Sequence, residues 1–298
     1  MNTLSCIARV KRTSENEFNR PPDFPQYVFA TFTGDRSGSM RDMVSREKNI
    51  PAEGLYEFIT SQCKNALLNN QDSFISVTTF DEKNETVIDN TESKNINVSM
   101  ANCTEWMQPR GSTKLYDTAI GCLNKQKKNA NEFMESLPAH IRRLNPKVVK
   151  IWALMTDGYD NASFSSSRDL RKTVELARED GTICYFLAAN MDAQEVGESF
   201  GFSADNSLTF DADIQHAPCA LRSVTANMLR TASNGSAAPF TQCQRQESQN
   251  HNAIRFVSAP TNSIMGAINT PLPSTRLNLR APPLPSRRNL RTAPLAPQ

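Results

Sequence analysis

The sequence has no long apolar run and few histidines. No stretch approaches the 18 or more apolar residues that a membrane span needs, and residues 1–10 are too short and polar for a signal-peptide core. The three histidines, His140, His216 and His251, are scattered and lack an evident partner, so none is assigned a catalytic role. We therefore expect a soluble protein that does not associate with a membrane.

Cysteine spacing excludes two further kinds of site. The seven cysteines include no CxxC pair, the spacing typical of zinc sites and of thioredoxin-like redox centres. Most of them fall within apolar segments, where a thiol packs as a small hydrophobic side chain. We expect them to be reduced, which favours a cytoplasmic, intracellular location.

The short motifs of several enzyme classes are also missing. The sequence contains no GxxxxGK[ST] phosphate loop, no GxSxG nucleophile elbow and no HExxH metal-binding helix. These absences predict a chain that is not itself an enzyme.

Charge is nearly balanced overall but unevenly distributed. The 33 basic and 31 acidic side chains give a net charge of +2, yet seven arginines and one glutamate follow residue 230. Nine of the 17 prolines lie between Pro239 and Pro297. Such a stretch cannot bury enough apolar surface to fold, so residues 233–298 are predicted to be a disordered tail.

Residues 1–26, which are polar and end in closely spaced prolines, are predicted to be a flexible arm.

Strand-like and helix-like patterns alternate between residues 27 and 232. Buried or strongly apolar strands are expected at 27–32, 147–155 and 182–188, an alternating strand at 72–80, and short edge strands at 85–88 and 96–98. Helices are expected at 55–67, 115–137, 165–179, 193–200 and 213–230. The alternation predicts an α/β domain with a doubly wound, mostly parallel, Rossmann-like sheet that has helices on both faces and one antiparallel edge strand.

Three short segments rich in hydroxyl and carboxylate groups fall where such a sheet binds ligands. One follows the first strand, one precedes the second long helix, and one follows the most apolar strand. Their oxygen-bearing side chains are Asp35, Ser37, Ser39, Thr113 and Asp157. Ligands of open parallel sheets bind beyond the carboxyl ends of the strands. Hard cations such as Mg²⁺ prefer oxygen donors, and this set would leave one coordination position for an external anionic group.

At these residues the chain resembles the von Willebrand factor A family, whose metal-ion-dependent adhesion site is written DxSxS, then a distant Thr, then a distant Asp. Asp35, Ser37 and Ser39 match the first element, Thr113 the second and Asp157 the third. The resemblance implies that the three hydroxyls contact Mg²⁺ or Mn²⁺, while the two carboxylates act directly or through water.

The resemblance covers residues 27–230 and has one departure. The segment 186–193 is similar to one found after the fifth strand in the intracellular, bacterial or viral branch of the family. The two residues before Asp35 are usually apolar, but here they are Thr33 and Gly34. This departure predicts a looser strand end and a weaker metal site.

The family resemblance implies a binding module in which an Asp or Glu of a partner protein completes the coordination of the metal. Two other roles stay open: a non-catalytic subunit that works with an ATPase, and a scaffold whose basic, proline-rich tail makes the main contacts. In that tail, Pro282, Pro285 and Arg287 fit the pattern PxxPx[KR], which docks on SH3-like grooves, although a solvated linker with no fixed partner is the plainer interpretation of this short pattern. No aromatic residue follows Phe256 to stack on bases, so nucleic-acid binding is not expected.

Plainer interpretations also exist for these polar residues. The segment 35–39 also fits an ordinary turn that caps a helix. Asp160 and Asn161 either extend the site or cap the helix that starts near Ser165. Asp117 is either an acceptor for the site loop or a first-turn acid favoured by the helix dipole.

Overall fold

The computed structural model describes residues 26–249, and its elements follow the predicted alternation. The strands are β1 (Tyr27–Asp35), β2 (Asp72–Phe80), β3 (Asn84–Glu92), β4 (Val148–Thr156), β5 (Thr182–Ala189) and β6 (Ser207–Phe210). The α-helices are α2 (Ile50–Leu68), α3 (Met100–Trp106), α4 (Leu115–Ser136), α5 (Ala139–Arg143), α6 (Ser167–Glu179), α7 (Ala193–Ser199), α8 (Ala217–Asn234) and α9 (Gln242–Glu247). Short 3-10 helices are η2 (Gly38–Met43), η3 (Ser93–Asn95) and η4 (Ala204–Asn206).

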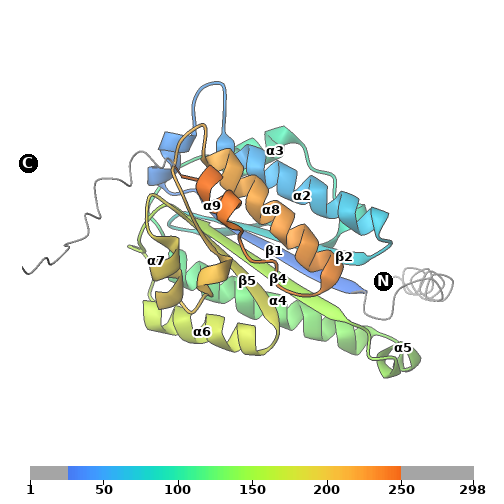
Figure 1. Cartoon of the computed structure of the whole chain (residues 1–298). Coiled ribbons are helices and arrows are strands. Elements are labelled where there is room, and N and C mark those ends of the chain that lie inside the picture. Colours follow the sequence, from blue (N-terminus) through green and yellow to red (C-terminus); the bar gives the residue numbers. More distant parts are fainter. Residues whose placement is uncertain (1–25, 250–298) are drawn as a thin grey trace, which may run out of the picture. The chain divides into compact units, whose positions relative to one another are not determined.

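The strands form a six-stranded sheet in the order β3-β2-β1-β4-β5-β6 (Figure 1). All neighbouring pairs are parallel except β2 and β3, which are antiparallel. Strand order reverses between β1 and β4, because the chain first builds outward to β2 and β3 and then returns to the other side of β1. The predicted fold class, a doubly wound α/β domain with one antiparallel edge strand, is confirmed.

Helices cover both faces of this sheet (Figure 1). Helices α2, α3 and α8 pack on one face, and α4, α6 and α7 pack on the other. Alternate residues of β1 serve the two faces: Val28, Ala30 and Phe32 join the cluster under α2 and α8, whereas Tyr27 and Phe29 pack against α4. Because both faces are covered, every residue of β1 is buried.

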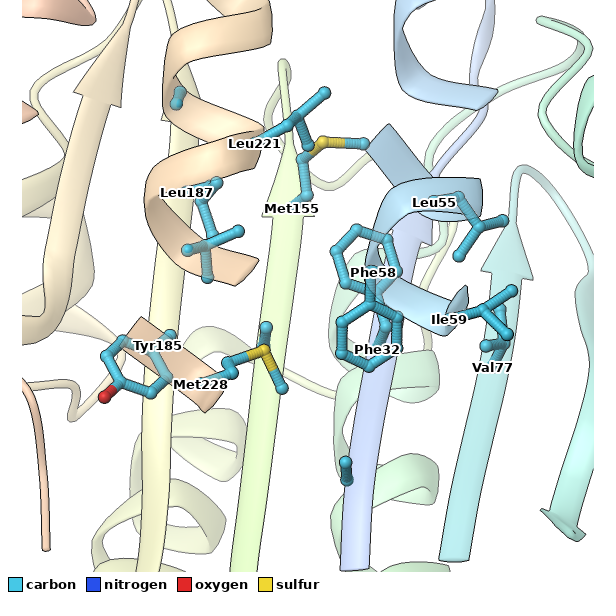
Figure 2. Packing of buried hydrophobic residues seen from close by; sticks show 14 of the residues in the cluster. Phe32, Leu55, Phe58, Ile59, Val77, Met155, Tyr185, Leu187, Leu221 and Met228 are labelled. Atoms are coloured by element: carbon cyan, nitrogen blue, oxygen red, sulfur yellow. The ribbon is translucent and has the colours of Figure 1, made fainter. Parts of the chain in front are cut away.

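The largest apolar cluster lies between the sheet and helices α2 and α8 (Figure 2). Phe32 on β1 and Phe58 on α2 contact each other, with ring centroids 5.4 Å apart. The two helices approach closely at Gly54, where a Cβ atom would lie 2.5 Å from Cδ1 of Leu221. The cluster therefore fixes α2 against α8 as well as against the strands.

Short elements account for most differences between prediction and structure. β3 is one strand over Asn84–Glu92 instead of two, and residues 96–98 form no strand. Most β3 side chains are exposed or half-buried, so their alternation is too weak to mark its length. β6 and α3 were not predicted, because four and seven residues are too few to show a hydrophobic period.

The ordered fold extends beyond the predicted boundary at residue 233. α8 continues to Asn234, and α9 follows after a short connection. Phe240 in this connection is buried and its ring centroid lies 5.7 Å from that of Tyr185, while Arg245 on α9 donates to the carbonyl of Ser207. A tail that begins at 233 is therefore wrong for residues 233–249, because single anchoring side chains hold this segment without a periodic pattern. The remainder of the predicted tail and residues 1–25 lie outside the described residues.

Within residues 26–249, no helix is both long and apolar enough to span a lipid bilayer. The six cysteines of this range are all free thiols. Burial raises the pKa of Cys184 to about 12, so this thiol stays protonated at neutral pH.

Candidate metal centre

The three predicted segments meet at one edge of the sheet, where the neighbouring parallel strands β1 and β4 end. Main-chain hydrogen bonds connect them. The amide of Gly38 donates to the carbonyl of Gly111 at 3.1 Å, and the amide of Asn161 donates to the carbonyl of Thr113 at 3.0 Å. The loop after β1, the loop before α4 and the loop after β4 therefore form one framework.

The side chains of the predicted ligands converge on this framework. The hydroxyl oxygens of Ser37 and Ser39 lie 2.9 Å apart, and the Ser39 hydroxyl donates to Oδ1 of Asp157 at 2.7 Å. A Cβ atom on Gly158 would lie 3.7 Å from the Ser39 hydroxyl oxygen and 3.9 Å from that of Thr113. The hydroxyls from two loops thus face the same space, and a glycine at position 158 leaves that space free of a side chain.

Asp35 is fully buried at the end of β1. Its Oδ1 accepts from the amide of Ser37 and its Oδ2 accepts from the hydroxyl of Thr156, both at 2.7 Å. Burial raises the pKa of Asp35 to about 6, the negative charge of Asp157 adds to the rise, and these hydrogen bonds oppose it. The pKa of Asp157 is also raised, mainly by burial and further by the charge of Asp42.

This donor set fits a hard divalent cation. It consists of carboxylate and hydroxyl oxygens, which such cations prefer over nitrogen or sulphur. Burial and the charge of Asp157 both disfavour ionised Asp35, and a positive charge between the two carboxylates would reverse both effects. The plain-turn interpretation of segment 35–39 does not account for its contact with Asp157, because that residue lies 118 positions further along the chain.

Asp160 and Asn161 support the site loop and do not cap the helix that follows them. Oδ1 of Asn161 accepts from the amide of Thr113 at 2.8 Å, and Oδ1 of Asp160 accepts from the amide of Leu115 at 2.8 Å. The helix α6 is capped by Ser166. The two side chains therefore hold the start of α4 in place, and the expected capping role for them at α6 is wrong.

Asp117 is an acceptor for the loop after β4. Its carboxylate accepts from the amides of Phe164 at 3.0 Å and Ser165 at 2.9 Å, while its own amide donates to the hydroxyl of Ser163. Burial alone would raise the pKa of Asp117, but the hydrogen bonds from Ser165, Phe164 and Lys114 outweigh it and lower the pKa to about 2. The interpretation as a first-turn acid alone is therefore incomplete.

An ion network beside the site, with a buried centre and an exposed rim, could not be predicted from the sequence. The Arg36 side chain is 2% exposed, with Nε 2.9 Å from Oδ2 of Asp81 and Nη2 2.7 Å from Oε2 of Glu85. Arg110 contacts the same two acids, at 2.6 Å and 3.3 Å. No local pattern signals this network, because Asp81 and Glu85 lie 45 and 49 residues from Arg36 in sequence.

The two residues before Asp35 do not loosen the end of β1. The hydroxyl of Thr33 accepts from the indole nitrogen of Trp152 at 2.9 Å, in a buried position. A Cβ atom on Gly34 would lie 3.3 Å from Cε of Met107, so the backbone there is closely covered. The strand pairs with β2 through Asp35. The predicted loosening is wrong, because neighbouring side chains satisfy the polar group and fill the space.

The remaining candidate residues stand apart from this centre. The predicted tail contacts Pro282, Pro285 and Arg287 lie outside the described residues. His216, for which the sequence showed no partner, lies with Nδ1 2.7 Å from Oδ2 of Asp213. A group of possible metal ligands comprises Asp211, Asp213 and His216. Oδ1 of Asp213 also accepts from the amide of His216, so the turn that begins α8 already explains why these two side chains lie close together.

Comparisons with known proteins give only structural similarities. No family model and no curated protein matches the sequence. A von Willebrand factor type A structure from Catenulispora acidiphila is 15% identical, with a TM-score of 0.43, and the match covers 69% of this chain and 43% of that one. Proximal thread matrix protein 1 from the mussel byssus, solved with a zinc-occupied MIDAS motif, is 14% identical, with a TM-score of 0.39 and coverage of 72% and 48%.

A manganese-loaded TRAP protein from Plasmodium vivax is 17% identical, with a TM-score of 0.37 and coverage of 55% of this chain and 57% of that one. The chain spans about half the length of these solved proteins. None of these TM-scores reaches 0.5.

Proposed function

We propose that this chain is a von Willebrand factor A-type binding module whose adhesion site holds Mg²⁺ or Mn²⁺ and binds an Asp or Glu carboxylate of a partner protein. The observation that carries the proposal is the convergence of Ser37, Ser39 and Asp157 from separate loops at the carboxyl edge of β1 and β4. The DxSxS, Thr and Asp elements of the family supply the same side chains in the same order.

The proposed roles follow from the donor chemistry. Ser37, Ser39 and Thr113 would contact the cation through their hydroxyls, and Asp35 and Asp157 would balance its charge directly or through water. Two ionised carboxylates formally balance a divalent cation, and its local positive charge faces the coordination position that the protein leaves open. A bound cation supplies this charge and a coordination position for a carboxylate, which makes the partner contact charge-assisted.

Metal binding is tested by isothermal titration of the full chain with Mn²⁺ and Mg²⁺. Thr113→Ala and Asp157→Asn are expected to weaken binding by at least about tenfold, since each removes a proposed ligand. Asp89→Asn is the matched control, because Asp89 is a 58% exposed carboxylate that pairs with Lys125 away from the site. Equal binding by all three variants and the wild type would rule out this centre.

Partner binding is tested by affinity capture from native extract with Mg²⁺ or with chelator, read by mass spectrometry. We expect capture that needs metal and is lost in Asp157→Asn but not in Asp89→Asn. Capture of the same proteins in chelator would contradict a metal-bridged contact. Co-capture of an ATPase, or loss of capture when the basic tail is removed, would instead support the roles that the sequence leaves open.

A further inference from the structure

Resting on the proposed function, we propose that Tyr159 and Phe164 form an apolar contact patch beside the metal. This patch selects partners in which the acidic residue is next to a large apolar residue. Both aromatic residues lie in the loop between β4 and α6 (residues 157–166), which begins with the proposed ligand Asp157.

The exposure of the two side chains is the first observation. Phe164 is 95% exposed and Tyr159 is 68% exposed. Burying such an exposed ring against a partner removes apolar surface from water, which favours association. Single exposed apolar residues are common on protein surfaces, so exposure alone does not define a site.

The second observation is that the loop holds Phe164 outward by specific contacts. The carboxylate of Asp117 accepts from the amides of Phe164 and Ser165, at 3.0 and 2.9 Å. The amide of the preceding Ser163 donates to Oδ2 of Asp160 at 3.2 Å. Consecutive main-chain groups are thus fixed to the start of α4 or to the loop itself. The main chain that carries the ring is therefore held in place by the loop itself, and a bound partner would not need to order that main chain.

The third observation is the continuity of this patch with the metal centre. The amides of Asn161 and Ala162 both donate to the carbonyl of the proposed ligand Thr113, at 3.0 and 3.2 Å. The next residue, Lys114, places its ammonium nitrogen 5.2 Å from the centre of the Phe164 ring. Tyr159 follows Gly158, whose Cα position faces the Ser39 and Thr113 hydroxyls. The patch and the proposed ligands therefore belong to loops that are hydrogen-bonded to one another.

The chemistry of the partner follows from this arrangement. A carboxylate bound to the metal would bring its neighbouring residue over residues 159–164, where an aliphatic or aromatic side chain can pack on the exposed rings. The ammonium group of Lys114 lies over the ring and is paired with the carboxylate of Asp117 at 3.4 Å, so it adds little net charge to the patch. The geometry therefore points to an acidic–apolar sequence such as Asp-Leu on an exposed segment of a partner protein.

The test uses two capped tetrapeptides, Gly-Asp-Leu-Gly and Gly-Asp-Gly-Gly, titrated at millimolar concentration into the ¹⁵N-labelled full chain with saturating Mg²⁺ and followed by NMR. The wild type is expected to bind the Asp-Leu peptide about tenfold more tightly than the Asp-Gly peptide, the ratio that one buried aliphatic side chain provides. Phe164→Ala is expected to remove this preference while metal affinity, measured by titration calorimetry, stays unchanged. Leu176→Ala is the control, since Leu176 is an exposed apolar residue (52%) near the end of α6.

The outcomes separate the two proposals. Metal-dependent binding of both peptides with no preference, or a preference retained in Phe164→Ala, overturns the patch and leaves the metal site standing. Binding of the Asp-Leu peptide that survives chelator but is lost in Phe164→Ala overturns the metal bridge and leaves the patch. If neither peptide shifts any resonance with metal present, both proposals fail.

Discussion

Arg36 and Asp81 form an ion pair in which both side chains are only 2% exposed, with Nε 2.9 Å from Oδ2. Arg36 follows the proposed ligand Asp35 and precedes Ser37, while Asp81 directly follows strand β2. The amide of Arg36 also donates to the carbonyl of Phe80 at 2.8 Å. The pair therefore ties the first segment of the metal centre to the end of β2.

Removing one partner of this pair leaves a buried charge. Arg36→Met is expected to lower the free energy of unfolding by about 3–5 kcal/mol, because the buried carboxylate of Asp81 would lose its buried cationic partner. The measurement is urea unfolding followed by circular dichroism. Arg110→Met is the control: this arginine contacts the same acid but is 58% exposed, so a loss of about 1 kcal/mol or less is expected. Equal losses in the two variants would show that burial of Arg36 does not decide its contribution.

The pKa of Asp35 predicts how the metal-free chain responds to pH. Folding raises this pKa from its ordinary value of 3.8 to about 6, so the folded state binds the proton more tightly. Stability from this residue is therefore fully present below about pH 4 and lost as pH rises through 6, by about 3 kcal/mol at most. In chelator, Asp35→Asn should remove this decline, which thermal unfolding between pH 4.5 and 8 would detect. Parallel curves for wild type and variant would contradict the assignment.

Added Mg²⁺ should reverse that decline only in the wild type. A ligand that binds the folded state alone stabilises it by RT ln(1 + [L]/Kd), so the melting temperature at pH 7.5 should rise with metal concentration. Below pH 6 the increase should shrink, because protonated Asp35 no longer balances the charge of the cation. Asp35→Asn should show little increase at either pH. A similar increase in the variant would indicate metal binding elsewhere.

Asp117 holds the loop after β4, and its removal should release that loop. Asp117→Ala is expected to cost about 1–3 kcal/mol, since two main-chain amides lose their acceptor. Amide hydrogen exchange at Phe164 and Ser165 should accelerate, while exchange in the strands should change only with global stability. Asp89→Ala serves as the control for loss of an exposed carboxylate. Unchanged exchange at 164 and 165 would contradict the role given to Asp117.

Two glycines offer a matched test of the packing between α2 and α8. Gly54→Ala should destabilise the fold by about 1–3 kcal/mol, because its Cβ would lie 2.5 Å from Leu221 and overpacking forces the helices apart. Gly121 lies on α4, and a Cβ atom added there would meet nothing within 4 Å, so Gly121→Ala should stabilise by about 0.5–1 kcal/mol through helix propensity. Chemical denaturation of both variants would reveal the opposite signs.

Sequence patterns predicted the parts of this molecule that depend on local repetition. The strand at 72–80 was predicted with its observed bounds, because its buried apolar residues and its β-branched side chains identify it. The segments around Asp35, Thr113 and Asp157 were predicted to meet, because the ends of parallel strands share one edge of the sheet. That they hold a metal stays a prediction.

The contacts that support the site could not be predicted from these patterns. For Asn161 and Asp160, capping the nearest helix in sequence was one of two interpretations, but they act on the start of α4, more than 40 residues earlier in the chain. Arg36 lies inside the motif, and only the fold reveals its partners, the buried Asp81 and the exposed Glu85. A sequence pattern identifies residues that recur at a regular spacing along one helix or strand. These contacts instead join residues that are close only in the folded chain.

The attachment of α9 to strand β6 has a practical consequence for any shortened version of this protein. β6 is the last strand of the sheet, and Arg245 donates to the carbonyl of its first residue, Ser207. A chain ended at residue 232 would lose this arginine and the buried Phe240, and would leave the carbonyl of Ser207 without this donor at the edge of the sheet, where other chains can pair. Such a truncated protein would be prone to aggregate, and a version that ends at residue 249 retains the natural protection.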